Sequence, residues 1–139
     1  MSKCPKAGLI ACLFSAAFLT SNAAPAQTIT PTPSIALKNG ETAELFDAYF
    51  ISTLCRSLLI GTPQVEVLDG PPGVSVTIKE TMVTPRSYGC AKPVAGGKVL
   101  VSAKDVDEPS YSTMTLRIKY NTRIGPRESS QVYKISLFP

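Results

Sequence analysis

The strongest constraint on the fold is a period of two in the hydrophobic pattern. From residue 34 onward, apolar and polar residues alternate in short runs separated by Gly, Pro and Asn-Gly turn signals, and none of these runs has helical periodicity. This pattern predicts an all-β fold: a single antiparallel β-sandwich of seven or eight short strands with one buried face each. The residues expected to point inward are Ile35, Leu37, Ala43, Leu45, Val65, Val67, Val74, Val76, Ile78, Val99, Val101, Ala103, Leu116, Ile118, Tyr120, Tyr133, Ile135 and Leu137.

Some segments are less clear in this pattern. The alternation around Leu45 predicts that Phe46 points outward, and residues 49–51 form a short β-prone run. Residues 54–60 fit either one helical turn or a bulged strand, and the sequence does not decide between them. The last two runs predict a hairpin over residues 115–138.

Residues 1–26 have the order of an export signal. Lys3 and Lys6 come first, an uncharged run of 13 residues follows at 7–19, and small residues then offer cleavage after Ala23 or Ala26. A membrane-spanning helix needs roughly 20 apolar residues, so we expect this segment to be cleaved rather than to anchor the protein. The sequence therefore predicts a signal peptide at 1–26, an extended segment at 27–33 and a sandwich at 34–139. It also predicts a periplasmic or secreted protein whose mature part has no transmembrane span.

Cys12 raises the alternative of a lipid anchor, because Leu9-Ile10-Ala11-Cys12 resembles a bacterial lipobox. Only five apolar residues precede this cysteine, and the apolar run continues well past it. A lipid anchor at Cys12 is therefore not expected.

Cleavage would remove two of the four cysteines and leave Cys55 and Cys90. In an oxidising compartment such a pair most simply forms one disulfide, although two free thiols are the alternative. The spacing is not Cys-x-x-Cys, so the pair does not predict a thioredoxin-like redox site.

The net charge does not indicate nucleic acid as a partner. The chain has 14 basic and 10 acidic residues, and loss of Lys3 and Lys6 leaves 12 − 10 = +2. Nucleic-acid-binding domains usually carry a strongly basic patch or stripe, which this balance does not suggest.

The short strands, the cysteine pair and the final hairpin together resemble an immunoglobulin-like β-sandwich. The stretch Gly89-Cys90-Ala91-Lys92-Pro93-Val94-Ala95-Gly96-Gly97 also resembles small uncharacterised exported bacterial proteins. The resemblance implies a fold and a compartment, not an activity. It has two departures: the chain has no tryptophan, and the spacing of 35 between the cysteines is shorter than in typical antibody domains.

The longest stretch without alternation, residues 81–97, is the candidate binding loop. It contains Arg86, Tyr88 and Lys92, and Lys98 follows directly. No acidic residue lies between Glu80 and Asp105. Such a loop, held at Cys90, would suit anionic groups of an envelope or extracellular macromolecule, such as lipid headgroups, acidic glycans or carboxylates. The alternative interpretation is a solvated connection whose charges only aid solubility.

Catalytic and cofactor motifs are scarce. The chain has no histidine, which excludes Ser-His-Asp and Cys-His catalysis and removes a major zinc ligand. The acidic run at 105–108 predicts a solvated turn rather than a calcium loop, and Gly96-Gly97-Lys98 lacks the spacing of a phosphate-binding loop. We therefore expect no metal and no cofactor.

Paired carboxylates keep one enzymatic alternative open. Glu66 and Glu80 lie on adjacent predicted strands, and two carboxylates suffice for glycoside hydrolysis. The favoured prediction is nevertheless a non-catalytic exported protein that binds a macromolecule or has a structural role, through strand edges or the candidate loop. The alternative is a small exported hydrolase that uses paired carboxylates.

Overall fold

The computed structural model describes residues 31–139. The predicted signal peptide, its cleavage positions after Ala23 and Ala26, the possible anchor residue Cys12 and most of the 27–33 segment lie outside the described residues. The first strand begins at Ser34.

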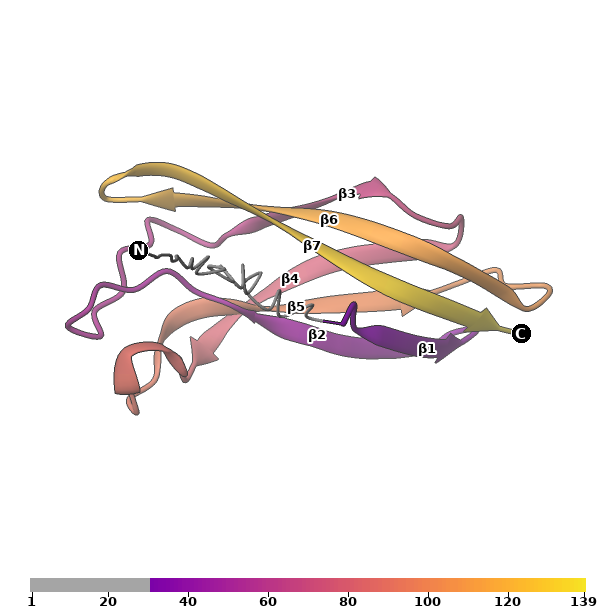
Figure 1. The fold of residues 1–139 in the computed structure, drawn as a ribbon, viewed down its shortest axis with the longest axis horizontal. Helices are drawn as coiled ribbons and strands as arrows, with labels where there is room; N and C mark the ends of the chain where they lie inside the picture. Colours follow the sequence, from indigo (N-terminus) through magenta and orange to yellow (C-terminus); the bar gives the residue numbers. More distant parts are fainter. Residues whose placement is uncertain (1–30) are drawn as a thin grey trace, which may run out of the picture. The chain divides into compact units, whose positions relative to one another are not determined.

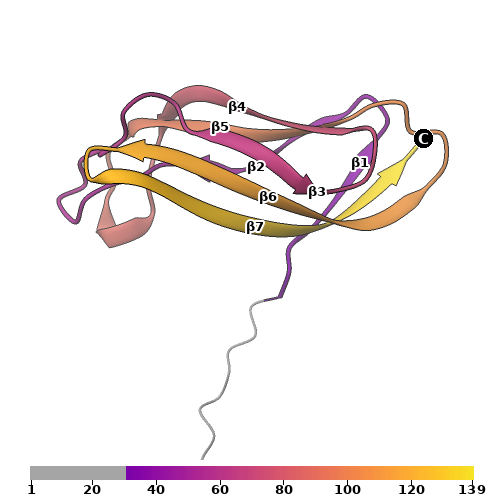
Figure 2. The same cartoon turned by 90° about the horizontal axis from the view of Figure 1, so that it is seen from above.

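The described chain is all-β and forms two sheets that face each other (Figures 1 and 2). One sheet has the order β1-β7-β6-β3 and the other the order β2-β5-β4. The strands are β1 (Ser34–Lys38), β2 (Thr42–Ala48), β3 (Gln64–Asp69), β4 (Val74–Val83), β5 (Val94–Ala103), β6 (Ser110–Thr122) and β7 (Gly125–Phe138), with a 3-10 turn at Ser87–Gly89. The prediction of an all-β fold is confirmed.

The prediction of purely antiparallel pairing is wrong at one edge, because β1 pairs parallel to β7. The turn at 39–41 carries the chain from one sheet to the other, so β1 and β2 do not form a hairpin. The Asn39 N–H donates to the Phe138 carbonyl (2.7 Å), and the Gly40 N–H donates to the Ala103 carbonyl on the facing sheet (2.8 Å). The first strand therefore lies beside the last one.

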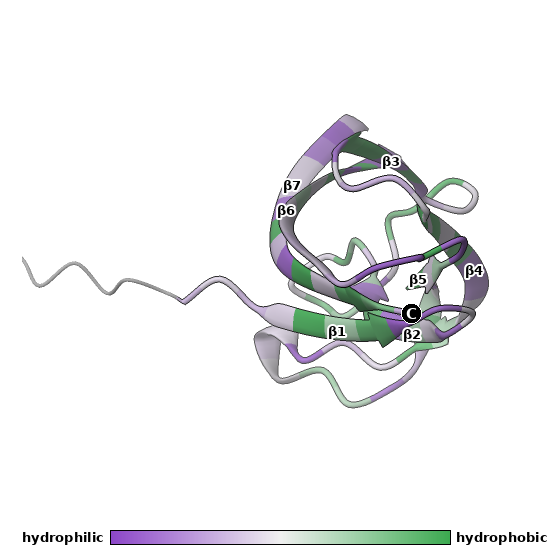
Figure 3. Cartoon of the chain, turned by 90° about the vertical axis from the view of Figure 1, so that its right-hand side faces the viewer, coloured by the Kyte–Doolittle hydropathy of each residue, from purple (hydrophilic) through white to green (hydrophobic). Residues whose placement is uncertain are grey.

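The core lies between the two sheets and is built from alternate residues of their strands. Residues predicted to point inward that are at most 2 % exposed are Leu37, Val99, Val101, Ala103, Leu116, Ile118, Ile135 and Leu137. Hydrophobic residues accordingly form interrupted bands along the strands in Figure 3. Met114 is also fully buried, because β6 begins at Ser110 and the final hairpin is longer than the sequence suggested.

Phe46 points inward, so its predicted orientation is wrong. The pairing of β2 with β5 shifts register between Glu44 and Phe46. Such a bulge inserts one residue and reverses the side-chain parity beyond it. The Phe46 ring consequently packs against the core and stacks on Tyr133, with centroids 6.3 Å apart.

The predicted loop at 81–97 is also too long. Strand β4 continues to Val83, β5 begins at Val94, and these two residues pair, which leaves a connection at 84–93. Gly96 and Gly97 obscure the alternation because the strand has no room for side chains there. A Cβ on Gly96 would lie 2.5 Å from the Ala48 carbonyl oxygen, and one on Gly97 would lie 2.5 Å from Ile78 Cγ2.

Residues 54–60 form neither a helical turn nor a bulged strand. They belong to an irregular connection that is held by two isolated bridges, Ile51 with Ser57 and Leu59 with Thr122. The β-prone run at 49–51 lies beyond the end of β2, and only Ile51 makes a bridge.

Two tyrosines make the stability of the fold depend on pH in the alkaline range. Burial raises the pKa of Tyr133 above its ordinary value of 10.0. The pKa of Tyr120 is raised as well: burial is the main cause and the nearby Tyr49 adds to it, while a hydrogen bond with Ser129 opposes it.

A phenol with a raised folded-state pKa stabilises the fold below its unfolded-state pKa of about 10. This contribution is lost as the pH rises from there through the folded-state pKa. We therefore expect the urea midpoint to fall above about pH 10, and Tyr133→Phe to fall less steeply than the wild type. Urea unfolding across this range measures the difference, and parallel profiles for the two proteins would contradict the assignment.

Candidate functional site

Three connections meet at one end of the two sheets, at the left of Figure 1. We call this region the loop end and define it as residues 49–63 between β2 and β3, 84–93 between β4 and β5, and 123–124 between β6 and β7. The other three connections lie at the opposite end of the strands with the C-terminus: residues 39–41, 70–73 and 104–109. The strand order thus gathers segments that are far apart in the sequence.

Covalent and hydrogen bonds hold the loop end together. The predicted disulfide between Cys55 and Cys90 is present, with a Cα–Cα distance of 5.6 Å, and it joins the first two connections. The Ile60 N–H donates to the Asn121 carbonyl (2.7 Å), and the Arg123 N–H donates to the Leu58 carbonyl (2.9 Å). The first connection is therefore bonded to both of the others.

The connection at 84–93 is fixed by further polar contacts. The Tyr49 hydroxyl hydrogen-bonds with Ser87 Oγ (3.2 Å) and accepts from the Arg86 N–H (3.4 Å). Cys55 and Tyr88 both have left-handed backbone conformations, with φ of 62° and 54°. Non-glycine residues adopt this conformation at an energetic cost, so the surrounding structure must hold it.

Positive charge is concentrated at the loop end. Its connections carry Arg56, Arg86, Lys92 and Arg123 and contain no Asp or Glu. All four side chains are exposed, and none forms an ion pair within residues 31–139. These cations are therefore free to meet a partner.

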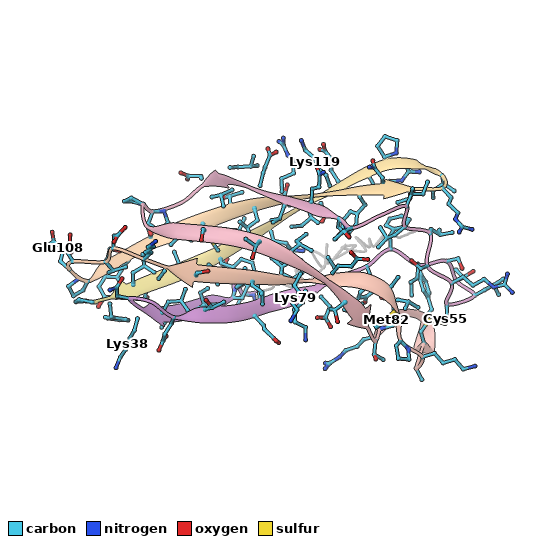
Figure 4. The ribbon with its side chains drawn as sticks, turned by 180° about the vertical axis from the view of Figure 1, so that it is seen from behind. Lys38, Cys55, Lys79, Met82, Glu108 and Lys119 are labelled. Carbon is cyan, nitrogen blue, oxygen red and sulfur yellow. A yellow bond between two sulfur atoms is a disulfide. The ribbon has the colours of Figure 1, made fainter. Side chains whose placement is uncertain are left out.

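The opposite end of the strands is acidic. Its connections contain Glu41, Asp105, Asp107 and Glu108 against a single cation, Lys104. Figure 4 shows Glu108 at one end of the strands, together with Lys38 of β1, and Cys55 and Met82 at the other end. The charges of the connections are thus sorted by end.

Large apolar side chains are also exposed at the loop end. Leu54 is 75 % exposed and Tyr88 65 %, while Ile60 and Ile124 are more than half exposed. Among residues predicted from the sequence, the structure brings Arg86, Tyr88 and Lys92 to this surface.

Lys98, the fourth predicted member, lies elsewhere. It belongs to β5, is only partly exposed, and its Nζ lies 3.3 Å from Glu44 Oε2 and 4.0 Å from Asp47 Oδ1. Lys98 therefore belongs to the strand that begins four residues earlier, at Val94, and not to the connection at 84–93.

An open depression of about 460 Å³ lies beside the loop end. Its lining comes from β2 and from the starts of the 49–63 and 84–93 connections: Glu44, Leu45, Phe46, Asp47, Tyr49, Thr84 and Arg86. Both of its carboxylates contact Lys98, so the negative charges there are already paired within the sheet, whereas Arg86 has no ion-pair partner among residues 31–139.

The two carboxylates considered for hydrolysis lie on different sheets. Glu66 is on β3 and Glu80 on β4, and these consecutive strands do not pair with each other. Glu66 instead contacts Arg117 (3.4 Å) and Lys119 (3.2 Å) on the neighbouring strand β6. The geometry gives Glu66 the surroundings of a surface ion pair.

The acidic run at 105–108 lies in the connection between β5 and β6, as expected for a turn. The Val106 N–H donates to Asn39 Oδ1 (3.2 Å), which joins this turn to the one at 39–41. Within residues 31–139, no three His, Cys, Asp or Glu side chains are grouped so as to hold a metal ion.

Sequence reasoning missed Arg56, Arg123 and the exposed apolar residues around them. They lie about 30 residues before or after the candidate loop, and only the strand order brings them beside it. One local signal was available: an apolar residue and a cation stand next to each other or two positions apart in each of these turns.

Comparison with known proteins gives no relative. No protein-family model matches the chain, and neither a curated protein nor a solved structure matches it. Across the described residues, no helical segment has the length and apolar character needed to cross a bilayer.

Proposed function

We propose that this protein is an exported, non-catalytic binding module of the cell envelope or extracellular space. Its loop end would contact a negatively charged macromolecule. The observation that carries the proposal is the sorting of charge. Four exposed cations without an ion pair in the described part of the chain share the loop end with several exposed apolar side chains, whereas the opposite connections are acidic. Loops on a rigid scaffold commonly carry binding residues.

The proposed fold type is immunoglobulin-like. Immunoglobulin-type domains place strands B, E and D in one sheet and C, F and G in the other. The orders β2-β5-β4 and β3-β6-β7 would correspond to these sets, with β1 added parallel to the last strand. The loop end would then contain the B–C and F–G connections, which bind antigen in variable domains. The lack of tryptophan and a disulfide between two connections rather than two facing strands are departures.

Export is supported by two independent features. Residues 1–26 have the order of a signal peptide, and Cys55 and Cys90 are within bonding distance in the folded chain. Structural disulfides persist in oxidising compartments such as the periplasm and the extracellular space. The proposed location is therefore the periplasm or the outside of the cell.

A binding role is favoured over hydrolysis by the surroundings of the acidic residues. Glu66, Glu44 and Asp47 each contact a lysine or arginine on the surface of a sheet. A hydrolase of the paired-carboxylate type needs two carboxyl groups that face one substrate across a cleft. We assign no catalytic residue and no cofactor.

Retention on isolated envelope material tests the proposal. We expect saturable retention of the wild-type protein and a three- to tenfold loss in Arg86→Ala/Lys92→Ala, because each exposed charge pair contributes up to about 1 kcal/mol. Lys38→Ala/Lys104→Ala removes the same charge at the opposite end and should be retained like the wild type. Equal retention of the two variants would contradict a role for the loop end.

A further inference from the structure

Each connection of the loop end presents an exposed apolar side chain beside a cation. Leu54 stands two residues before Arg56 in the first connection, and Tyr88 stands two residues after Arg86 in the second. In the turn between β6 and β7, Ile124 follows Arg123 directly. The same pair of chemical groups thus occurs in three connections that are bonded together.

We propose that the loop end docks on an anionic lipid bilayer. The apolar side chains enter the headgroup layer, and the cations bind lipid phosphates. This inference rests on the proposed function and names its partner. A bilayer surface offers negative phosphates and apolar acyl chains within about 5–10 Å of one another, which matches paired apolar and cationic groups.

The form of the surface favours a bilayer over a protein or glycan partner. The exposed apolar residues stand on separate connections. Tyr49, Thr84 and Arg86 line the neighbouring depression together with β2 residues, but Leu54, Tyr88 and Ile124 do not. An acidic glycan would pair with the cations but leave Leu54 and Ile124 in water. A single-stranded nucleic acid needs several aromatic platforms, and Tyr88 is the exposed aromatic residue on this surface.

The acidic connections at the opposite end favour one orientation of the protein on the membrane. Strand β7 has 14 residues, and at about 3.3 Å per residue the two ends of the sheets are separated by several Debye lengths of about 8 Å. A negative surface therefore attracts the near end with little opposition from Glu41, Asp105, Asp107 and Glu108. It also repels the protein in the reversed orientation, so the charges select one way of docking.

The disulfide contributes by keeping the insertion residues together. Cys55 lies between Leu54 and Arg56, and Cys90 lies two residues from both Tyr88 and Lys92. Their bond fixes two of the three apolar–cationic pairs on one surface before a membrane is met. Less ordering is then required on binding, which favours affinity.

Vesicle flotation with protein recovered after export tests the inference. The wild-type protein should float with phosphatidylcholine vesicles that contain about one-third phosphatidylglycerol, and it should not float with pure phosphatidylcholine. Arg86→Gln/Lys92→Gln should lower the partition coefficient about tenfold or more, since each cation near an anionic surface contributes up to about fivefold. Lys38→Gln/Lys104→Gln, with the same change in net charge, should partition like the wild type.

Apolar variants separate insertion from simple charge attraction. Leu54→Ser/Ile124→Ser should weaken flotation at least severalfold without changing its salt dependence, because the cations remain. Leu68→Ser/Val132→Ser removes two exposed apolar side chains from strands β3 and β7 and should have no such effect. Equal losses in the two variants, or no loss in either, would overturn insertion at the loop end.

The outcomes also distinguish this inference from the proposed function. Retention on envelope material through the loop end, combined with no flotation on anionic vesicles, would overturn the lipid inference and leave the binding module standing. Retention by immobilised acidic polysaccharide with no vesicle binding would likewise show that a lipid bilayer is not the partner. If the wild-type protein neither bound envelope material nor floated with anionic vesicles, both proposals would be wrong.

Discussion

Loss of the Cys55–Cys90 disulfide is expected to lower the free energy of unfolding by about 4 kcal/mol. The bond joins residues 35 positions apart, and closing a loop of that length restricts the unfolded chain. Net stabilities of domains are only about 5–15 kcal/mol, so this is a large share. Urea unfolding of the oxidised wild type and of Cys55→Ser/Cys90→Ser measures it.

The reduced wild-type protein is the matched control, because it differs from the oxidised protein only in having two thiols in place of the sulfur–sulfur bond. It should unfold at the same urea concentration as the double variant, below that of the oxidised protein. If residual structure already held the two cysteines close together in the unfolded chain, the difference would be under about 1 kcal/mol. That outcome would contradict the role given to the disulfide.

Truncation of Ile118 to alanine is expected to cost about 2–5 kcal/mol. Ile118 is 0 % exposed and lies in β6, which has β7 on one side and β3 on the other. Its neighbours across the strands are Val65 and Ser129, and its side chain belongs to the hydrophobic core between the two sheets. The strands cannot collapse into the cavity without losing their pairing, so the cost should be in the upper part of this range.

Thr113→Ala provides the comparison on the same strand. Thr113 is exposed, so its truncation removes little buried surface and should cost less than about 1 kcal/mol. Urea unfolding of both variants measures the contrast. Similar costs for Ile118→Ala and Thr113→Ala would mean that the face of β6 assigned to the core is not buried.

The sequence predicted the parts of the fold that depend on local periodicity. Alternation identified most buried residues of β5, β6 and β7 but missed Val94 and Met114, and the Asn39-Gly40 pair identified the first turn. Where one face of a strand is buried, its pattern is readable without knowing which strand lies beside it. Val67 on β3, predicted to point inward, is an exception, because it is 40 % exposed.

Features that depend on pairing between strands were not predictable in this way. The bulge at Glu44–Phe46 reversed Phe46, and the close approach of Ala48 and Ile78 to β5 explains Gly96 and Gly97. The local pattern does not predict either feature, because each is determined by a neighbouring strand that is distant in sequence. The parallel pairing of β1 with β7 has the same origin.

The candidate site was found only in part for the same reason. A run without acidic residues identified Arg86, Tyr88 and Lys92, but Arg56 and Arg123 belong to other connections. Their meeting follows from the strand order, since alternate connections of the two sheets fall at one end. Single-sequence reasoning therefore gave one connection of a surface that is made of three.

Hydrogen exchange of the protein bound to envelope material, compared with the free protein, tests the central claim most directly. If the loop end is the contact surface, amides in residues 49–63, 84–93 and 123–124 will exchange more slowly in the bound state. The outer edges of β3 and β4, which pair on that side with no strand of residues 31–139, will be unchanged. Slower exchange along those edges with no change at the loop end would contradict the claim and indicate binding by strand addition.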